Sequence, residues 1–369
     1  MRDPLQKTRC PRAAGLLLRA LGCLFLGLGL FCLADWTVGT PAVQASLWNA
    51  VGRRVASRDW FMGNVVKTRR IKAEEAAWAR RGEIVLVGSS QVGAGFDLDR
   101  LETELEGTLV RMMSIGDMDS TRVLFALPYL CVGPDDVVVW YLSSRDVVAT
   151  PPLHLNWMRP FSSWRGVAEI LPLLDGRTWI SSWRSLADLF LSATSELWRS
   201  RDYVRHVLLN AGGLNDPIRT TAAQDQLQRD MDNAVALREQ LDPRERTALE
   251  DIQFAALGRA IQRLAQGRGR RLVVLEGQMN PLMETPADQR LKARLDAALR
   301  EGSNDLGFTY LSIADQGLEH PASEWKDPSH LNAVGRDKLT GFLLDYFRRH
   351  PELRPNSVSR EGGSAMIPL

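Results

Sequence analysis

Cysteine is scarce in this chain, and its positions exclude the structures that depend on it. The four cysteines among 369 residues are Cys10, Cys23, Cys32 and Cys131. The first three lie before or within an apolar N-terminal run, which leaves Cys131 alone in the rest of the chain. One cysteine cannot form an intradomain disulfide, and no two have the spacing of zinc ligands. The sequence therefore predicts neither a disulfide framework nor a metal site.

The chain also lacks an excess of charge, internal repeats and long low-complexity segments. Its 46 lysines and arginines are scattered among 44 aspartates and glutamates, for a formal net charge of +2. A nucleic-acid-binding surface needs clustered positive charge, so nucleic acid is not an expected partner. Once residues 1–80 are set aside, about 290 residues remain, which suits one large α/β domain with insertions.

Phosphate-binding loops are missing as well. Gly88 and Gly93 have the spacing of a phosphate loop, but Ala94 stands where the lysine would be. The dinucleotide-binding fingerprint would need a glycine at position 90, which is serine. We therefore expect no nucleotide or other cofactor.

One long hydrophobic run is present, near the N-terminus. Residues 13–34 are apolar apart from Arg19, and residues 1–12 carry four basic side chains against one acidic one. About twenty apolar residues span a bilayer core as a helix, and positive charge before the span keeps the N-terminus in the cytoplasm. We expect a retained single-pass membrane anchor, with everything after Asp35 outside the cytoplasm. A cleaved signal peptide is the alternative, because residues 43–45 form an acceptable cleavage site, although one farther from the apolar run than usual.

Three further segments follow the anchor. Residues 35–80 mix tryptophans with basic side chains, which is typical of a juxtamembrane stalk, although residues 73–79 also fit the first helix of the domain. The main domain is expected over residues 81–350, and residues 351–369 are expected to form a flexible polar tail.

Within the domain, short aliphatic runs alternate with longer helical patterns. The runs predict strands at 84–87, 109–115, 136–142, 271–276 and 308–313, and the patterns predict helices at 117–130, 247–267, 287–301 and 332–349. Such alternation predicts a flavodoxin-like parallel sheet with right-handed crossovers. The carboxyl ends of these strands then lie on one rim, which is where open α/β sheets place chemistry.

Residues 147–243 interrupt the alternation as a helical insertion. The insertion leaves the carboxyl end of the third strand, so we expect it to overhang that rim as a cap. It contains five tryptophans and a helical stretch at 222–240. The tryptophans suit either packing of the cap on the sheet or stacking on sugar rings.

Two short polar segments carry the residue types of a nucleophile, a base and an acid. Gly88-Ser89-Ser90 follows the first strand, and Asp327-Pro328-Ser329-His330 precedes the last helix. A serine hydroxyl needs a base within hydrogen-bond reach and a third group to orient that base. A carboxylate three residues before a histidine can reach its imidazole. Each segment alone is an ordinary loop or helix cap, but together and in this order they favour a catalytic Ser90, His330 and Asp327.

These two segments resemble motifs of the SGNH (GDSL-like) hydrolase superfamily. The resemblance also includes Phe96 to Asp99, Gly116 and the run from Asp327 to Gly335. More narrowly, the chain resembles the membrane-tethered branch that includes the DltD and alginate O-acetylation proteins, whose serine motif is often Gly-Ser-Ser. The resemblance covers residues 83–147 and 268–348. It implies Ser90 as nucleophile, His330 as base, Asp327 as its orienter and the Gly116 N–H as an oxyanion donor.

One element of the superfamily pattern does not carry over. An asparagine that donates to the oxyanion is expected after the third strand, where this chain has Arg145. An arginine can also donate, and loss of one donor costs about 100- to 1,000-fold in rate. Asn280, after the fourth strand, is either a replacement donor or part of a turn before Pro281.

The resemblance implies a serine acyltransferase or esterase that acts on small acyl groups, O-acetyl above all, of a cell-envelope polysaccharide. It also implies a multi-pass, acyl-exporting membrane partner. Two alternatives stay open. One is a simple carbohydrate esterase or deacetylase with water as acceptor; the other is an inactive, glycan-binding scaffold of an acylation complex, for which Arg145 is the main argument.

Overall fold

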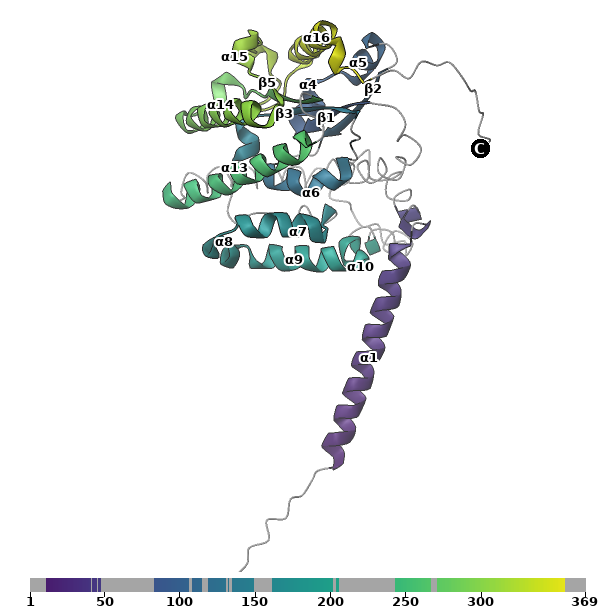
Figure 1. Ribbon diagram of the computed structural model, residues 1–369. Helices are drawn as coiled ribbons and strands as arrows, with labels where there is room; N and C mark the ends of the chain where they lie inside the picture. Colours follow the sequence, from purple (N-terminus) through teal and green to yellow (C-terminus); the bar gives the residue numbers. More distant parts are fainter. Residues whose placement is uncertain are drawn as a thin grey trace, which may run out of the picture.

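The computed structural model describes residues 11–40, 42–44, 46–47, 83–105, 108–114, 119–130, 132, 135–148, 161–201, 204–205, 243–266 and 271–355. Most of the predicted stalk, the predicted helices at 73–79 and 222–240, and Gly116 lie outside these residues. The described part is an α/β domain with an N-terminal helix that projects from it (Figure 1).

A five-stranded, all-parallel sheet forms the centre of the domain. Its strands are β1 (Glu83–Gly88), β2 (Leu109–Ser114), β3 (Val137–Leu142), β4 (Leu272–Glu276) and β5 (Thr309–Leu311). Their order in space is β2-β1-β3-β4-β5, the order of flavodoxin-like sheets. Every residue of β1, β3 and β4 is buried, as the aliphatic runs predict for strands covered on both faces. All five predicted strands are confirmed to within two residues at each end.

Helices cover both faces of the sheet (Figure 1). One face carries α4 (Ser90–Gly95), α5 (Leu98–Glu104), α15 (Ile313–Gln316) and α16 (Ala333–Arg349), and the other carries α6 (Ser120–Leu130), α13 (Pro243–Ala265) and α14 (Pro286–Leu306). Successive strand residues alternate between the two cores: Leu86 packs in the α16 core and Val87 in the α6 core. The α16 core extends past the predicted domain end, since the 3₁₀ turn Pro351–Leu353 buries Leu353.

The described part of the insertion packs on α6. Its described helices are α7 (Trp164–Ile170), α8 (Gly176–Ser181), α9 (Trp183–Thr194) and α10 (Glu196–Arg199), with the 3₁₀ turn Leu171–Leu173 between α7 and α8. Gly166 of α7 lies so close to α6 that a β-carbon there would be 2.7 Å from the Phe125 ring. For this part of the insertion the predicted overhang is wrong. Apolar residues of α7 and α9 belong to the same buried core as those of α6 and α13. The two helices therefore form an extra layer beyond α6.

The N-terminal helix α1 (Pro11–Gly39) is separate from the sheet. Its segment Arg19–Gly39 is long and apolar enough to cross a membrane, as predicted for residues 13–34. Only its C-terminal end contacts the domain: Asp35 Oδ1 accepts hydrogen bonds from Ser195 Oγ (2.6 Å) and from Leu197 N (2.7 Å). Helix α1 therefore joins the domain at the layer formed by the described helices of the insertion (Figure 1).

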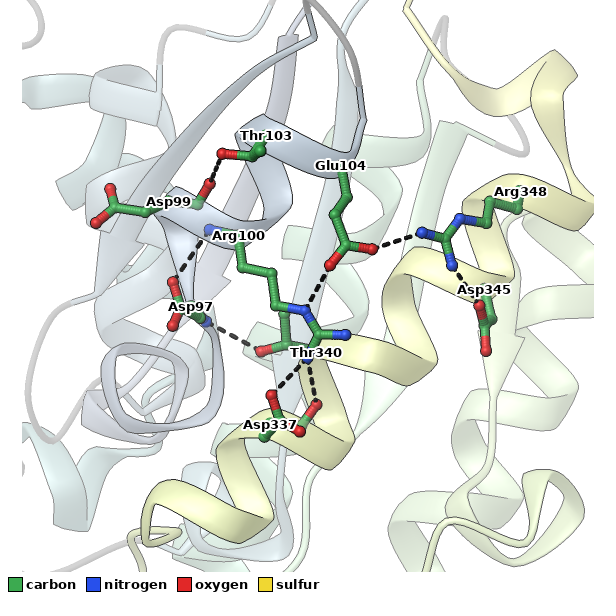
Figure 2. A network of polar contacts seen from close by, with 9 residues as sticks. All are labelled: Asp97, Asp99, Arg100, Thr103, Glu104, Asp337, Thr340, Asp345 and Arg348. Carbon is green, nitrogen blue, oxygen red and sulfur yellow. Dashed lines mark hydrogen bonds and ion pairs between the residues drawn. The ribbon is translucent and has the colours of Figure 1, made fainter.

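A polar network ties α5 to α16 (Figure 2). At its exposed side Arg100 binds Glu104 (2.7 Å) and Asp337 (2.5 Å), and such surface pairs contribute little stability. At its sheltered side the Asp97 N–H donates to Oγ1 of Thr340, a fully buried residue, over 3.0 Å. The buried Thr340 hydroxyl is costly to leave unpaired, so this contact does more to fix α16 beside the segment that follows β1.

The turn after β1 requires glycine at position 88. A β-carbon there would lie 2.6 Å from the Tyr141 carbonyl oxygen and 2.5 Å from Cγ2 of Val92, and the φ angle is 157°. We expect Gly88→Ala to lower the free energy of unfolding by about 2 kcal/mol or more, measured by urea denaturation of the detergent-solubilised chain. The matched control is Gly258→Ala on α13, which has open space and should stabilise the chain by about 0.5–1 kcal/mol. Equal stability of Gly88→Ala and wild type would contradict the steric argument.

Candidate active site

Ser90 lies where β1 gives way to α4, on the carboxyl edge of the sheet. It is the first residue of α4, so its N–H has no acceptor within the helix and is left free for a ligand. The preceding Ser89 is fixed through its carbonyl oxygen, which accepts from Val92 N (3.1 Å) and from Ser114 Oγ (3.0 Å). The turn is therefore held by β2 as well as by its own helix.

The three residues predicted as nucleophile, base and acid lie in one chain of hydrogen bonds. His330 Nε2 is 2.8 Å from Ser90 Oγ. His330 Nδ1 is 2.9 Å and 2.8 Å from the two carboxylate oxygens of Asp327. With Nδ1 protonated and donating to the carboxylate, Nε2 is the acceptor for the serine proton. This is the geometry that activates a serine hydroxyl.

Asp327 is held in its charged form. Partial burial by itself would raise the pKa of Asp327. Hydrogen bonds from the N–H groups of Ser329 (3.0 Å) and His330 (2.9 Å) and from the imidazole outweigh burial, so the pKa of Asp327 lies below its usual value. An ionised carboxylate at this point keeps His330 in one tautomer and stabilises the imidazolium that forms when it takes a proton.

The loop that carries Asp327 and His330 is closed at its base. Trp325 and Leu331 form an antiparallel bridge, with Lys326 N donating to the His330 carbonyl (2.9 Å). Asn332 then caps α16 by accepting from Val334 N (3.0 Å). The loop is thereby fixed to the start of α16.

Asn280 supports this loop in a way that favours the turn interpretation. Its side-chain oxygen accepts from Leu282 N (3.1 Å) in the 3₁₀ turn Pro281–Met283. Its backbone N–H donates to the Pro328 carbonyl (3.1 Å), within the Asp327–His330 segment. Asn280 therefore ties the end of β4 to the loop that carries Asp327 and His330.

Arg145 lies in the 3₁₀ helix Ser144–Val147, directly after β3, and is partly exposed. Its guanidinium has no hydrogen-bond acceptor among the residues that the structure describes. Gly116, the other expected oxyanion donor, lies outside the described residues.

A fully buried carboxylate, Asp146, lies behind the turn that carries Ser89 and Ser90 and was not singled out from the sequence. Its Oδ2 accepts from Ser143 N (2.7 Å) and Ser143 Oγ (3.0 Å) in a capping box. Burial raises the pKa of Asp146 to about 6, and hydrogen bonds from Ser143 and from the Ser89 side chain oppose the rise. Asp146 thus holds the residue next to Ser90. The spacing of Ser143 and Asp146 is the sequence signal for this cap.

Two other polar groups near the rim have structural roles. Glu276, at the end of β4, accepts from Ile313 N (2.9 Å) and Ser312 Oγ (3.0 Å), which joins β4 to the segment after β5. His320 is buried and its Nδ1 is 2.6 Å from Glu324. Among the described residues no cluster of histidine, cysteine, aspartate and glutamate could hold a metal ion.

No family model matches the chain, and neither the curated proteins nor the solved structures contain a match.

The buried Asp146 should make stability depend on pH. Because its pKa is raised in the fold, from 3.8 to about 6, its contribution is complete below pH 4 and is lost as the pH rises through 6. We expect the unfolding free energy of wild type, relative to Asp146→Asn, to fall by up to about 3 kcal/mol between pH 4 and 7. Urea denaturation of both proteins at several pH values measures this difference in unfolding free energy.

The control is Asp135→Asn, since the Asp135 side chain is 74% exposed and lies in the connection that precedes β3. Its difference from wild type should stay constant over that range. A constant difference for Asp146→Asn as well would show that Asp146 is not the titrating group.

Proposed function

We propose that this chain is an SGNH-like serine acyltransferase or esterase, tethered to the inner membrane, that acts on small acyl groups of a cell-envelope polysaccharide. The observation that carries the proposal is the hydrogen-bond chain Ser90–His330–Asp327, whose members lie up to 240 positions apart in sequence. The flavodoxin-like strand order and the place of Ser90 at the end of β1 support it.

In the first step the Ser90 oxygen attacks the carbonyl carbon of an acyl ester. The serine proton moves to His330 Nε2, and the carbonyl π electrons move to oxygen to give a tetrahedral oxyanion. Collapse breaks the bond to the leaving alkoxide, which takes the proton from His330. The products are an acyl-serine and a free alcohol.

In the second step His330 Nε2 takes a proton from an acceptor hydroxyl, whose oxygen attacks the acyl-serine. A glycan hydroxyl gives a transferred ester, and water gives a carboxylic acid; in both cases Ser90 recovers its proton from His330. Transfer requires the glycan to outcompete water. The choice of acetyl and glycan comes from the sequence resemblance.

The oxyanion needs donors aimed at it. The Ser90 N–H, free at the start of α4, supplies one, and the Gly116 N–H supplies a second in this proposal. The Arg145 guanidinium supplies a third, in place of the asparagine of the superfamily. A charged donor beside the oxyanion also suits the developing negative charge.

Location follows from α1. The segment Arg19–Gly39 spans the inner membrane in this proposal, with residues 1–12 in the cytoplasm and the domain outside it. A multi-pass membrane protein that exports the acyl group is the proposed partner, and no cofactor takes part.

Ser90→Ala should abolish covalent labelling by a fluorophosphonate and lower acetyl-ester turnover by about 10,000-fold or more, because the nucleophile is removed. Asp327→Asn should lower turnover by a similar factor through the wrong His330 tautomer. The control is Ser323→Ala, an exposed serine of the same region, which should leave labelling unchanged. Mass spectrometry of the labelled chain identifies the residue that carries the label. Incubation with candidate glycans separates transfer from hydrolysis. Labelling that survives in Ser90→Ala would refute the proposed nucleophile.

The second candidate is a non-catalytic scaffold, and Arg145 is the observation that favours it. If Arg145 is an oxyanion donor, Arg145→Ala should lower kcat by about 100-fold with little change in KM, and Arg145→Asn should restore part of it. The control is Arg165→Ala on α7, an exposed arginine away from the carboxyl edge of the sheet, which should leave kcat unchanged. If Ser90→Ala and wild type behave alike in ester cleavage and in envelope acylation, the result supports the non-catalytic scaffold instead.

A further inference from the structure

We propose that the outer face of α8 and α9 rests on the headgroup region of an anionic phospholipid bilayer, beside the point where α1 leaves it. The inference rests on the membrane insertion of α1 that is part of the proposed function. It adds a second membrane contact, made by the domain itself.

The surface of α8 and α9 is unusually apolar. The exposed fractions are 77% for Ile180, 58% for Trp183 and 48% for Leu191. Trp183 and Leu191 are eight residues apart and so share one side of α9, whereas Leu186 and Leu189 are buried against the rest of the domain. A helix that is apolar on its outer side as well as its inner side does not suit contact with water alone.

Two tryptophans of the insertion extend this apolar surface. Trp164 of α7 is 56% exposed and Trp179 of α8 is 38% exposed. Neither belongs to the buried core, although the Trp164 ring lies 5.8 Å from that of Phe190 on α9. Exposed tryptophans and arginines together are typical of the membrane interface, where the indole ring lies at the level of the headgroups.

The position of this surface relative to α1 identifies the occupant. Asp35 of α1 binds Ser195 and Leu197, and α9 ends one residue before Ser195. The end of α9 is therefore fixed at the residue where the apolar run 13–34 of α1 stops. Figure 1 shows α7 to α10 as the layer of the domain nearest α1, with α9 running across the direction of α1. A bilayer crossed by α1 would meet this layer first.

Aromatic and basic side chains agree with an anionic surface. Trp36 of α1, next to Asp35, is 71% exposed, as expected for a residue at the interface. Arg184 lies over the Trp183 ring, 5.4 Å from its centroid, and Arg165 and Arg177 are exposed on α7 and α8. The acidic side chains of these helices cap a helix or pair with arginine: Asp175, Glu169 and Asp188. The exposed charge is therefore mainly positive, which favours anionic headgroups.

The test uses the full chain with Cys10, Cys23, Cys32 and Cys131 replaced by serine. Single cysteines are introduced by Ile180→Cys in the proposed contact, Leu282→Cys as the control and Leu24→Cys within α1. Leu282 is 79% exposed, which matches Ile180, but it lies next to Asn280 at the carboxyl edge of the sheet, outside the layer of α7 to α10. Each is labelled with an environment-sensitive fluorophore and reconstituted in phosphatidylcholine–phosphatidylglycerol vesicles that contain nitroxide-labelled lipids.

We expect shallow nitroxides to quench the label at 180 at least about threefold more than the label at 282, and deep nitroxides to quench the label at 24 most. Quenching at 180 should weaken when phosphatidylglycerol is omitted, because the arginines lose their anionic partners. Fluorophosphonate labelling of the same samples checks that the domain is folded.

Two other outcomes overturn the inference in different ways. If 24 is quenched but 180 behaves like 282, α1 is inserted and only the second contact fails; shielding of 180 from aqueous iodide would then identify a second copy as the occupant. If 24 is not quenched, the membrane insertion itself fails, and with it this inference, whatever the result of the fluorophosphonate labelling.

Discussion

The hydrogen bond between Ser90 and His330 depends on contacts throughout the domain. Ser90 is placed by β1, which pairs with β2 and β3 on its two sides, and by the close approach of Gly88 to the Tyr141 carbonyl. His330 is placed by a loop closed through Trp325 and Leu331 and tied to β4 through Asn280. A 2.8 Å contact between segments so distant in sequence exists only when both supports are in place.

The two carboxylates of the site are in opposite electrostatic environments. Partly exposed Asp327 has a lowered pKa because N–H groups and an imidazole stabilise its charge. Asp146 is fully buried, and its pKa is raised because desolvation of the carboxylate outweighs the hydrogen bonds from Ser143 and Ser89. The first suits a group that orients a base by its charge, and the second suits a structural cap that holds the backbone near Ser90. Contrasting environments of this kind distinguish roles among residues of one type.

The proposed active site and the proposed membrane contact lie on two sides of the domain that do not overlap. The carboxyl edge of the sheet carries Ser90, His330 and Asp327, and the hydrogen bonds of these side chains come from one another and from their own loop. The layer of α7 to α10 lies beyond α6 and joins α1. In the proposed function this layer would set the height of the triad above the membrane, where an exported acyl group would arrive.

Local sequence determined the strands, the span of α1 and the candidate triad. Continuous aliphatic runs such as 84–87 have few stable environments other than a covered parallel strand, and an apolar run of some twenty residues matches a bilayer. The acid and base are three residues apart, so their contact is nearly local. The place of the insertion, the exposure of Trp164 and Trp183, and the burial of Asp146 could not be deduced in this way. Tertiary structure alone decided them, because a tryptophan or an aspartate suits several environments, and which one it meets depends on elements far away in the chain.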